Sequence, residues 1–370
     1  MQDKAAPLIG FVLLGQLLWN SFYIDYMITW GEYILIKKSM ESSYFTENFK
    51  TKIQELVSGK EGVSVTCGIL HNSQIELKMW DGEGEQNYQS QKYEIGSITK
   101  TFTGILLCEA IMLGKASLKD NLVKWMPELD NKKHWPTLEQ LVTHTSGFPE
   151  EDETNVDMNY FERNNYYMDW TREKMIEMIQ KLDLENKTYP GLYSNLGAAT
   201  IGLVLERIHE KSYKELICEL LQRYGLNNTK IYTTENIGLP GICQNGQVCD
   251  NWKWPEECGM ASAGALISTP EDLLKYGEIL LNQHDPAVKL AMKPITQVSK
   301  EGDEPTIEIG CFIMYFTDGK IYFHNGGTGC FNSALAIDIE KGIVMVFLSN
   351  CYLEKDANFI VSELYHRKKQ

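Results

Sequence analysis

Apolar and polar positions alternate along the chain from about residue 60 onward, and their spacing predicts the secondary structure. Two strand-like runs, 63–70 and 74–79, flank His71-Asn72-Ser73, which predicts a β-hairpin. Residues 98–113 are apolar and rich in helix formers, and Gly114 follows as a stop signal. This segment is therefore expected to form a helix.

The chain continues with helical patterns and then returns to strands. The helical patterns cover residues 138–145, 172–182, 198–210, 213–223 and 270–281. Strand patterns follow at residues 310–316, 320–324, 333–338 and 343–349, and a closing helix is expected at residues 359–365. Turn chemistry at Asp318-Gly319 and at Glu340-Lys341-Gly342 joins the strands into two pairs. The pattern indicates an α/β (α+β) architecture, with one sheet built from both chain ends and an inserted helical subdomain of roughly residues 115–285.

The N-terminal segment has a different character. Residues 5–24 carry no charged side chain, and this stretch of 20 residues has about the length of a membrane-spanning helix. We therefore expect residues 1–40 to be a membrane anchor or a signal peptide, with attachment through residues 5–36, and residues 41–370 to form the folded domain. A packed amphipathic helix is the alternative, because polar side chains dilute the stretch: Gln16, Asn20, Ser21 and Asp25. Two N-x-[ST] sequons, at Asn186 and Asn227, give weak support for a secretory route.

Composition and charge narrow the possible functions. With 370 residues and 43% hydrophobic content, the chain can bury a substantial core. Its 35 Lys+Arg against 50 Asp+Glu give a net charge of −15, and no basic stripe is visible. Because nucleic-acid binding needs a concentrated positive surface, a nucleic-acid partner is not expected.

The cysteine and histidine pattern gives no sign of a metal site. The nine cysteines include no C-x-x-C pair, and the seven histidines include no H-E-x-x-H motif. Cys243, Cys249 and Cys258 lie close enough in one loop-like stretch to bridge in an oxidising compartment.

The sharpest candidate for chemistry is Ser97, which begins the helix predicted at residues 98–113. A serine at this place is commonly a helix N-cap. However, Lys100 lies one helical turn further on and on the same face. An amine held beside a hydroxyl in a poorly hydrated pocket can accept the hydroxyl proton. Ser97 and Lys100 thus form a candidate nucleophile and proton acceptor.

Two further motifs could complete such a site. Tyr193 lies before a predicted helix, and beside a cationic lysine its phenolate form would be favoured, which would make it a proton carrier. Asn195 follows it. His324 ends a predicted strand and is followed by Gly326 and Gly327, which allow a substrate to approach the backbone closely. The Gly327 N–H could help bind a developing oxyanion.

These motifs resemble those of the active-site serine penicillin-recognising and β-lactamase-like family. Ser97-Ile98-Thr99-Lys100, Tyr193-Ser194-Asn195 and His324-Asn325-Gly326 match the S-x-x-K, [SY]-x-N and K-T-G elements in order. Residues 141–147, with the sequence LVTHTSG, and residues 262–273 also look like family segments. The resemblance covers about residues 60–365, and the nearest branch looks like class C β-lactamases, β-lactamase-like esterases and the mitochondrial β-lactamase-like serine proteins of animals.

The resemblance implies a β-lactamase/transpeptidase-like fold, with an antiparallel sheet and flanking helices, and a serine hydrolase acting on a small-molecule or peptide ester or amide. Ser97 would be the nucleophile, and Lys100 and Tyr193 would share its proton. The oxyanion would bind to backbone N–H groups of Ser97 and Gly327, beside Gly326. Substrate contacts would come from Asn195 and His324, the latter also able to support Tyr193. No metal or organic cofactor is implied. The oligomeric state is open, and the expected location is membrane-associated or secreted, with mitochondria as the alternative.

Departures from the family pattern affect the expected substrate. His324 stands where the family has lysine, so the fixed positive charge that meets a β-lactam or peptide carboxylate is absent. Ester or amide hydrolysis is therefore favoured over β-lactamase or D-alanyl-D-alanine peptidase activity. The Pro190-Gly191 turn lies unusually close to Tyr193. A non-catalytic scaffold is a further alternative, disfavoured by the intact nucleophile and proton acceptors.

Three other features have simpler interpretations. Residues 150–153 are four consecutive acidic residues, which are typical of a solvated loop. His144 is expected in a structural turn at a helix end. A set of aromatic and apolar residues could wall a substrate pocket, although ordinary packing is the default: Tyr160, Phe161, Tyr166, Tyr167, Met168 and Trp170.

Overall fold

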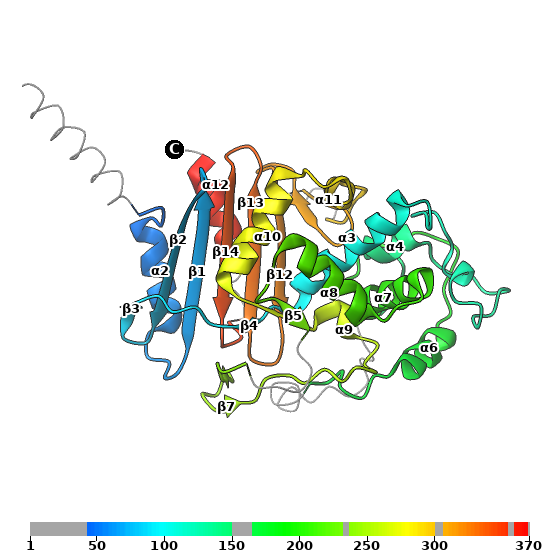
Figure 1. Cartoon of the computed structure of the whole chain (residues 1–370), viewed down its shortest axis with the longest axis horizontal. Coiled ribbons are helices and arrows are strands. Elements are labelled where there is room, and N and C mark those ends of the chain that lie inside the picture. The colour runs from blue at the N-terminus through cyan, green and yellow to red at the C-terminus, as the bar shows by residue number, and fades with distance from the viewer. Residues whose placement is uncertain (1–42, 150–164, 232–236, 300–305, 354–358, 369–370) are drawn as a thin grey trace, which may run out of the picture. The chain divides into compact units, whose positions relative to one another are not determined.

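The computed structural model describes residues 43–149, 165–231, 237–299, 306–353 and 359–368 (Figure 1). The chain divides into two units, residues 1–46 and residues 47–370, and all of the described helices and strands lie in the second. The apolar segment at residues 5–36 lies outside the described residues, so its membrane attachment stays a prediction. Within the described ranges, no helix combines the length and the apolar character that a membrane span requires.

A nine-stranded antiparallel sheet is assembled from both ends of this unit, as the sequence pattern predicted. Figure 1 shows the blue strands β1 and β2 beside the red and orange strands β14 and β13. Strand β1 pairs with β14 from Val65 opposite Ser349 to His71 opposite Ile343. The strands follow one another across the sheet as β3 (Gly84–Gln86), β2 (Gln74–Asp81), β1 (Ser64–His71), β14 (Ile343–Ser349), β13 (Asn332–Asp338), β12 (Ile321–Gly327), β11 (Met314–Phe316), β10 (Ile307–Ile309) and β9 (Thr296–Gln297).

Helices cover both faces of the sheet, which explains why β14 is apolar at nearly every position. On one face lies α10 (Pro270–Asn282), and a Cβ on its Gly277 would lie only 2.2 Å from Val344 Cγ1, so the helix and β14 are in close contact. On the opposite face, Phe347 packs against Phe359 of α12 (Phe359–Lys368), with ring centroids 5.6 Å apart. Helix α2 (Glu47–Val57) packs on β1 and β2.

Helix α3 (Thr99–Met112) is the central element of the helical region. Its sequence is apolar on all sides and most of its residues are buried, as expected of a helix surrounded by others. Gly114 follows it with a φ of +70°, confirming the predicted stop. The other helices of this region are α4 (Leu138–Val142), α6 (Arg172–Lys181), α7 (Asn195–His209), α8 (Tyr213–Tyr224), α9 (Ala261–Gly264) and α11 (Pro286–Met292), of which α7, α8, α9 and α11 pack against α3.

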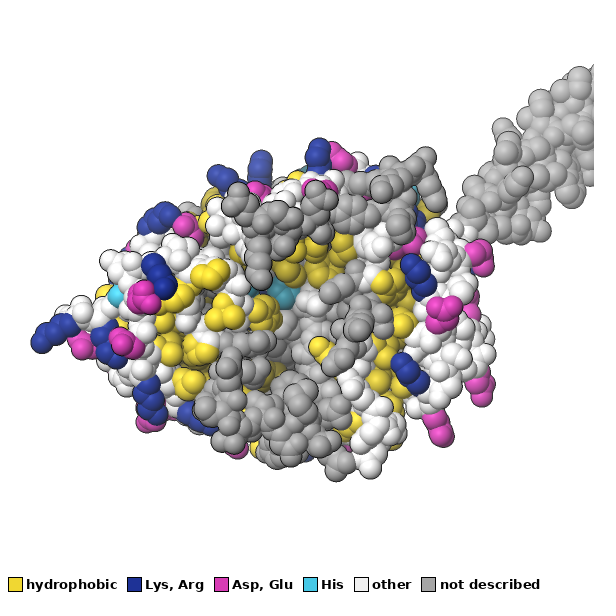
Figure 2. Space-filling view, turned by 180° about the vertical axis from the view of Figure 1, so that it is seen from behind, with side chains coloured by type: hydrophobic (Ala, Val, Ile, Leu, Met, Phe, Trp, Pro, Cys, Tyr) yellow, Lys and Arg dark blue, Asp and Glu magenta, His cyan; other side chains and the backbone are white. Residues whose placement is uncertain are grey.

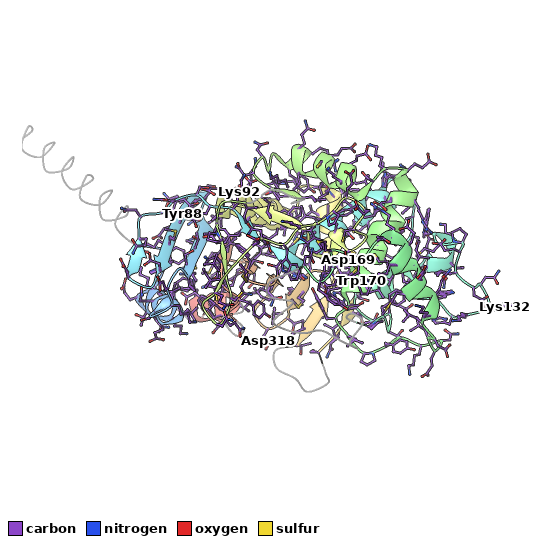
Figure 3. The ribbon with its side chains drawn as sticks, turned by 90° about the horizontal axis from the view of Figure 1, so that it is seen from below. Tyr88, Lys92, Lys132, Asp169, Trp170 and Asp318 are labelled. Atoms are coloured by element: carbon purple, nitrogen blue, oxygen red, sulfur yellow. A yellow bond between two sulfur atoms is a disulfide. The ribbon has the colours of Figure 1, made fainter. Side chains whose placement is uncertain are left out.

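Short strands and 3-10 turns connect the sheet to the helical region. The segment that leads from β3 towards α3 carries Tyr88 and Lys92 (Figure 3). It is fixed midway, because Tyr88 Oη donates to Glu271 Oε1, 2.5 Å away, at the start of α10. The connecting elements are β4 (Tyr93–Glu94), η1 (Gly96–Ile98), η2 (Leu122–Lys124), β5 (Lys230–Ile231), β6 (Gly241–Ile242), β7 (Val248–Cys249) and β8 (Leu266–Ser268).

The strand predicted at residues 310–316 is shorter in the structure. Only Met314–Phe316 is extended as β11, because the preceding residues turn into the helical region. Phe312 has a φ of +62° and its N–H donates to Val142 O, 3.0 Å away. This long-range contact overrides a local pattern that is compatible with a strand. The predicted hairpin at His71-Asn72-Ser73 is confirmed, with Asn72 and Ser73 both at positive φ, as a two-residue turn of this kind requires.

The expected bridging among Cys243, Cys249 and Cys258 is only partly right. The structure places a disulfide between Cys249 and Cys330, a pairing that spans 81 residues of sequence. Cys258 lies elsewhere, and its thiol donates to the Tyr167 carbonyl oxygen at 3.2 Å. The three cysteines of the prediction are near one another in sequence, but the turn after β12 brings Cys330 to the β6–β7 hairpin instead.

Candidate active site

Ser97 lies in η1, immediately before α3, and Lys100 lies in the first turn of α3. The Lys100 ammonium donates to Ser97 Oγ at 2.9 Å, as the spacing of the two residues predicted. Lys100 is fully buried, whereas Ser97 is partly exposed. The hydroxyl is thus open to a substrate while the cation beside it is shielded from water.

Three oxygen atoms surround the buried Lys100 ammonium. Besides Ser97 Oγ, it donates to Asn195 Oδ1 at 2.7 Å and to Ala263 O at 2.8 Å. An ammonium group has three N–H donors, and this arrangement offers an acceptor for each of them. These charge-assisted hydrogen bonds offset the cost of burying the charge and hold the side chain in one position.

Tyr193 completes the group around Ser97. Its Oη lies 2.6 Å from Ser97 Oγ, and Lys100 Nζ lies 4.9 Å from the centroid of its ring. The nearby Pro190-Gly191 turn therefore does not keep the tyrosine away from the serine. Ser194 is the N-cap of α7, because its Oγ accepts from Gly197 N at 2.9 Å, and so Tyr193 is fixed just outside the helix start.

His144 supports Tyr193, a contact that the sequence reasoning did not identify. It lies in the structural turn that was predicted, with a φ of +57°. Its Nδ1 accepts from Ser194 N at 3.1 Å, and its ring packs on the Tyr193 ring with centroids 4.7 Å apart. Burial, together with the charge of Lys100, lowers the pKa of His144 well below its usual range, which keeps Nδ1 available as an acceptor. The only signal in the sequence was the LVTHTSG segment itself.

Glycines bring the Ser97 backbone next to the end of β12. Gly96 has a φ of +47°, and a Cβ on it would lie 2.5 Å from Gly327 O. A Cβ on Gly326 would lie 2.1 Å from Ile95 O and 2.8 Å from Ser97 N. Gly327 is exposed at this point. The two backbone segments that carry the N–H groups expected to bind an oxyanion are therefore in direct contact.

His324 is buried beside this group and is neutral. Burial, with a contribution from the charge of Lys100, lowers the pKa of His324 to about 3. Its Nδ1 lies 2.5 Å from Asn325 O, and since a carbonyl can only accept, Nδ1 carries the proton and Nε2 is an acceptor. The ring of His144 packs on Tyr193, and the expected support of Tyr193 by His324 stays a prediction.

Asn195 is held from both sides. Its Oδ1 accepts from Lys100, and its Nδ2 donates to Tyr167 Oη at 3.0 Å. Tyr167 stacks on Trp254 with ring centroids 6.0 Å apart, and both are buried.

Tyr167 and Trp170 thus belong to packed aromatic structure rather than to an open pocket wall, while Tyr160 and Phe161 lie outside the described residues. Figure 2 shows hydrophobic side chains and a histidine gathered near the centre of the face seen there.

A buried carboxylate lies two residues before Gly96. Glu94 Oε1 accepts from Trp252 N at 2.6 Å, and among the described residues Oε2 has no hydrogen-bond partner. Burial raises the pKa of Glu94 from 4.5 to about 7. The folded protein therefore keeps this proton over a pH range in which the unfolded chain releases it.

This difference predicts a loss of stability as the pH rises. Because the folded pKa is raised, the free energy of unfolding should fall by about 2 kcal/mol between pH 5 and pH 8 through Glu94 alone. Glu94→Gln keeps an acceptor for Trp252 N and should remove this part of the slope. Urea unfolding at both pH values measures it, with the exposed Glu83→Gln as the control that keeps the wild-type slope. An unchanged slope in Glu94→Gln would contradict the assignment.

Comparison with known proteins places this geometry in a family. The family model described as "Beta-lactamase" matches residues 49–359. The chain is 29% identical over 235 residues to "Beta-lactamase-like protein 2" of Dictyostelium discoideum, covering 56% of this chain and 40% of that protein. It is 25% identical over 291 residues to "Protein flp" of Staphylococcus aureus (strain N315), covering 75% of this chain and 57% of that protein. The chain thus spans about half the length of these curated relatives.

Solved structures share the fold at low sequence identity. A D-stereospecific amidohydrolase from Streptomyces sp. is 19% identical with a TM-score of 0.70, over 85% of this chain and 98% of that one. D-amino acid amidase from Ochrobactrum anthropi SV3 is 19% identical with a TM-score of 0.68, over 87% and 99%. A class C β-lactamase is 16% identical with a TM-score of 0.67, over 87% and 97%. Since the family model covers residues 49–359, the chain belongs to the Beta-lactamase family, and it has the β-lactamase/transpeptidase-like fold.

Proposed function

We propose that this protein is a serine hydrolase, which cleaves an ester or amide bond through a covalent acyl-enzyme on Ser97. The observation that carries the proposal is the position of Ser97 Oγ, which lies 2.9 Å from Lys100 Nζ and 2.6 Å from Tyr193 Oη. A hydroxyl between a buried cation and a phenolate can give its proton to the phenolate as it attacks a carbonyl carbon.

The reaction proceeds in two stages. Ser97 Oγ attacks the carbonyl carbon and its proton passes to the Tyr193 phenolate, which the Lys100 charge stabilises. The carbonyl oxygen becomes an oxyanion between the N–H groups of Ser97 and Gly327. The C–O or C–N bond then breaks, and Tyr193 returns the proton to the leaving group. Water hydrolyses the acyl-enzyme by the same proton path.

The substrate proposed is a small-molecule or peptide ester or amide without an essential carboxylate at the position facing His324. The neutral, buried His324 offers no fixed positive charge there, which argues against β-lactamase or D-alanyl-D-alanine peptidase activity. The amidohydrolase and amidase among the structural neighbours support an amide. A membrane-associated or secreted location through residues 5–36 is part of the proposal.

Labelling with a fluorophosphonate tests the proposal. We expect one adduct per folded molecule, mapped by tryptic digestion to residues 93–100, in which Ser97 is the only serine. Heat-denatured protein is the control and should not react, because activation depends on the folded geometry. A folded protein that does not react, or reacts elsewhere, would favour the non-catalytic scaffold. Labelling of the same peptide by a fluorescent penicillin would favour the β-lactam-recognising alternative.

A further inference from the structure

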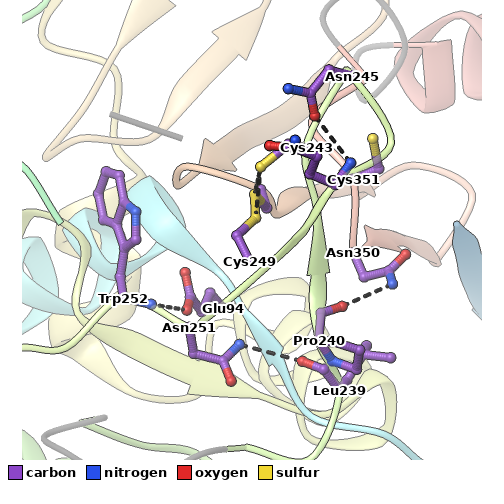
Figure 4. The surroundings of a disulfide bond; sticks show 12 residues. Glu94, Leu239, Pro240, Cys243, Asn245, Cys249, Asn251, Trp252, Asn350 and Cys351 are labelled. Atoms are coloured by element: carbon purple, nitrogen blue, oxygen red, sulfur yellow. Dashed lines mark hydrogen bonds between the residues drawn. A yellow bond between two sulfur atoms is a disulfide. The ribbon is translucent and has the colours of Figure 1, made fainter. Parts of the chain in front are cut away.

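Three cysteine sulfurs lie together beside the candidate site, although only two of them form a disulfide. The disulfide joins Cys249 and Cys330 (Figure 4). Cys243 Sγ lies 2.9 Å from Cys249 Sγ and 3.4 Å from Cys330 Sγ. All three residues are buried. The sulfur of a third cysteine is thus in contact with both sulfurs of the disulfide.

The three cysteines come from two segments of the chain. Cys243 and Cys249 belong to the β6–β7 hairpin, in which Cys243 N donates to Gln247 O at 2.8 Å. Cys330 lies in the turn between β12 and β13, three residues after Gly327. The hairpin and the turn are packed closely, because a Cβ on Gly241 would lie 2.6 Å from Cys330 Cβ. Exchange of partners would therefore need only local movement of side chains.

We propose that Cys243, Cys249 and Cys330 form a thiol–disulfide exchange site. The Cys243 thiol loses its proton and its sulfur attacks Cys249 Sγ, forming a Cys243–Cys249 bond as the Cys249–Cys330 bond breaks. Cys330 leaves as a thiolate and takes up a proton. Attack on Cys330 Sγ instead forms Cys243–Cys330 and releases Cys249. One disulfide and one thiol are present before and after each step, so neither an oxidant nor a reductant is consumed.

Solvent can reach the edge of this cluster. A cavity of about 640 Å³ between the hairpin and the segment after β14 is lined by Cys243, and also by Cys351 and Tyr352. Because the thiolate is the attacking species, exchange needs a place where the Cys243 proton can be passed on. Water in this cavity would provide it.

The three possible disulfides differ in what they connect. Cys249–Cys330 and Cys243–Cys330 both link the hairpin to the turn after β12, whereas Cys243–Cys249 closes within the hairpin and releases the turn. The segment that directly follows the hairpin is also bound to the segment before Ser97, because Trp252 N donates to Glu94 Oε1. A link to Cys330 therefore connects the Ser97 side of the site with the turn that follows Gly327. The effect on catalysis rests on the proposed function, but the exchange itself does not.

Disulfide mapping of the full-length protein tests the exchange directly. The protein is alkylated with N-ethylmaleimide in denaturant at mildly acidic pH and digested with trypsin, which leaves Cys243 and Cys249 on residues 231–253 and Cys330 on residues 321–341. Fragmentation of these peptides identifies the alkylated cysteine. We expect at least two of the three linkages in the wild type. A single linkage, or none, overturns the proposal.

Single substitutions provide a second test that does not require catalysis. After equilibration with oxidised glutathione, Cys330→Ser should contain Cys243–Cys249, Cys249→Ser should contain Cys243–Cys330, and Cys243→Ser should contain only Cys249–Cys330. Cys351→Ser is the matched control, since Cys351 lines the same cavity but lies outside the three-sulfur group, and it should keep the wild-type mixture. Failure of Cys330→Ser and Cys249→Ser to form their disulfides, in folded protein, would refute the exchange.

The effect on the site is measured separately as the rate of fluorophosphonate labelling. We expect Cys330→Ser, in which the turn is released, to react about tenfold more slowly than Cys243→Ser, in which the link is fixed. Equal labelling rates would show that the disulfide exchange does not affect the position of the Gly327 N–H group. If the wild type shows exchange but no labelling, the proposed function fails and the exchange site stands.

Discussion

Ser97→Ala is expected to lower kcat/KM for an activated ester by at least about 10⁴-fold, and Lys100→Met by about 10³-fold. The alanine variant has no nucleophile. The methionine variant keeps the length and apolar stem of the lysine but removes the only cation that donates to Ser97 Oγ within the described residues. It also leaves Asn195 Oδ1 and Ala263 O without this donor.

The effects of the two substitutions on kcat/KM should not be additive. Ser97 and Lys100 act in one proton transfer, so the double variant should be no slower than Ser97→Ala alone. The matched control is Lys275→Met, because Lys275 is an exposed lysine that donates to a backbone carbonyl, Gly225 O, at 2.8 Å, away from the site. Steady-state kinetics measures the loss of kcat/KM, and thermal unfolding of the same variants shows whether they are folded. Labelling of folded Lys100→Met at the wild-type rate would contradict the role of Lys100.

The sequence predicted those parts of the site that depend on local spacing. Ser97 and Lys100 are three residues apart on one helix, so their contact follows from helix geometry. The sheet built from both ends was predictable because β13 and β14 are apolar runs bounded by turn residues. The contact of Tyr193 with Ser97 depends on how α7 packs beside α3, and only the family resemblance indicated it.

Other features could not be read from the sequence because they depend on long-range packing. The contact of His144 with Tyr193 requires that two loops meet beside η1. The neutral state of His324 results from its burial near Lys100, and nothing in the residues around it indicates this. Cys330 is 81 residues from Cys249, and proximity along the chain suggested Cys258 instead. In each case the deciding quantity is a distance between segments far apart in sequence.

Gly96→Ala is expected to slow the labelling of Ser97 by about 10²-fold or more. The added Cβ would lie 2.5 Å from Gly327 O and 2.7 Å from Gly327 N, distances that require the two backbone segments to separate. Both N–H groups assigned to the oxyanion are next to this contact, Ser97 directly after Gly96 and Gly327 opposite. A shift of about 1 Å at such a position is enough to produce an effect of this size.

Gly114→Ala is the control that separates the steric clash of the added Cβ from the backbone strain of a positive φ. Gly114 has a φ of +70°, so alanine is strained there as it is at Gly96, but an added Cβ at Gly114 meets nothing within 4 Å. Both variants should lose about 1 kcal/mol of stability from strain. Only Gly96→Ala should lose the reaction with the fluorophosphonate, measured on folded protein at a temperature well below either unfolding midpoint. If the two variants react equally fast, the close approach of Gly96 and Gly327 is not what positions the oxyanion, and stabilisation would have to come from the Lys100 side of the site.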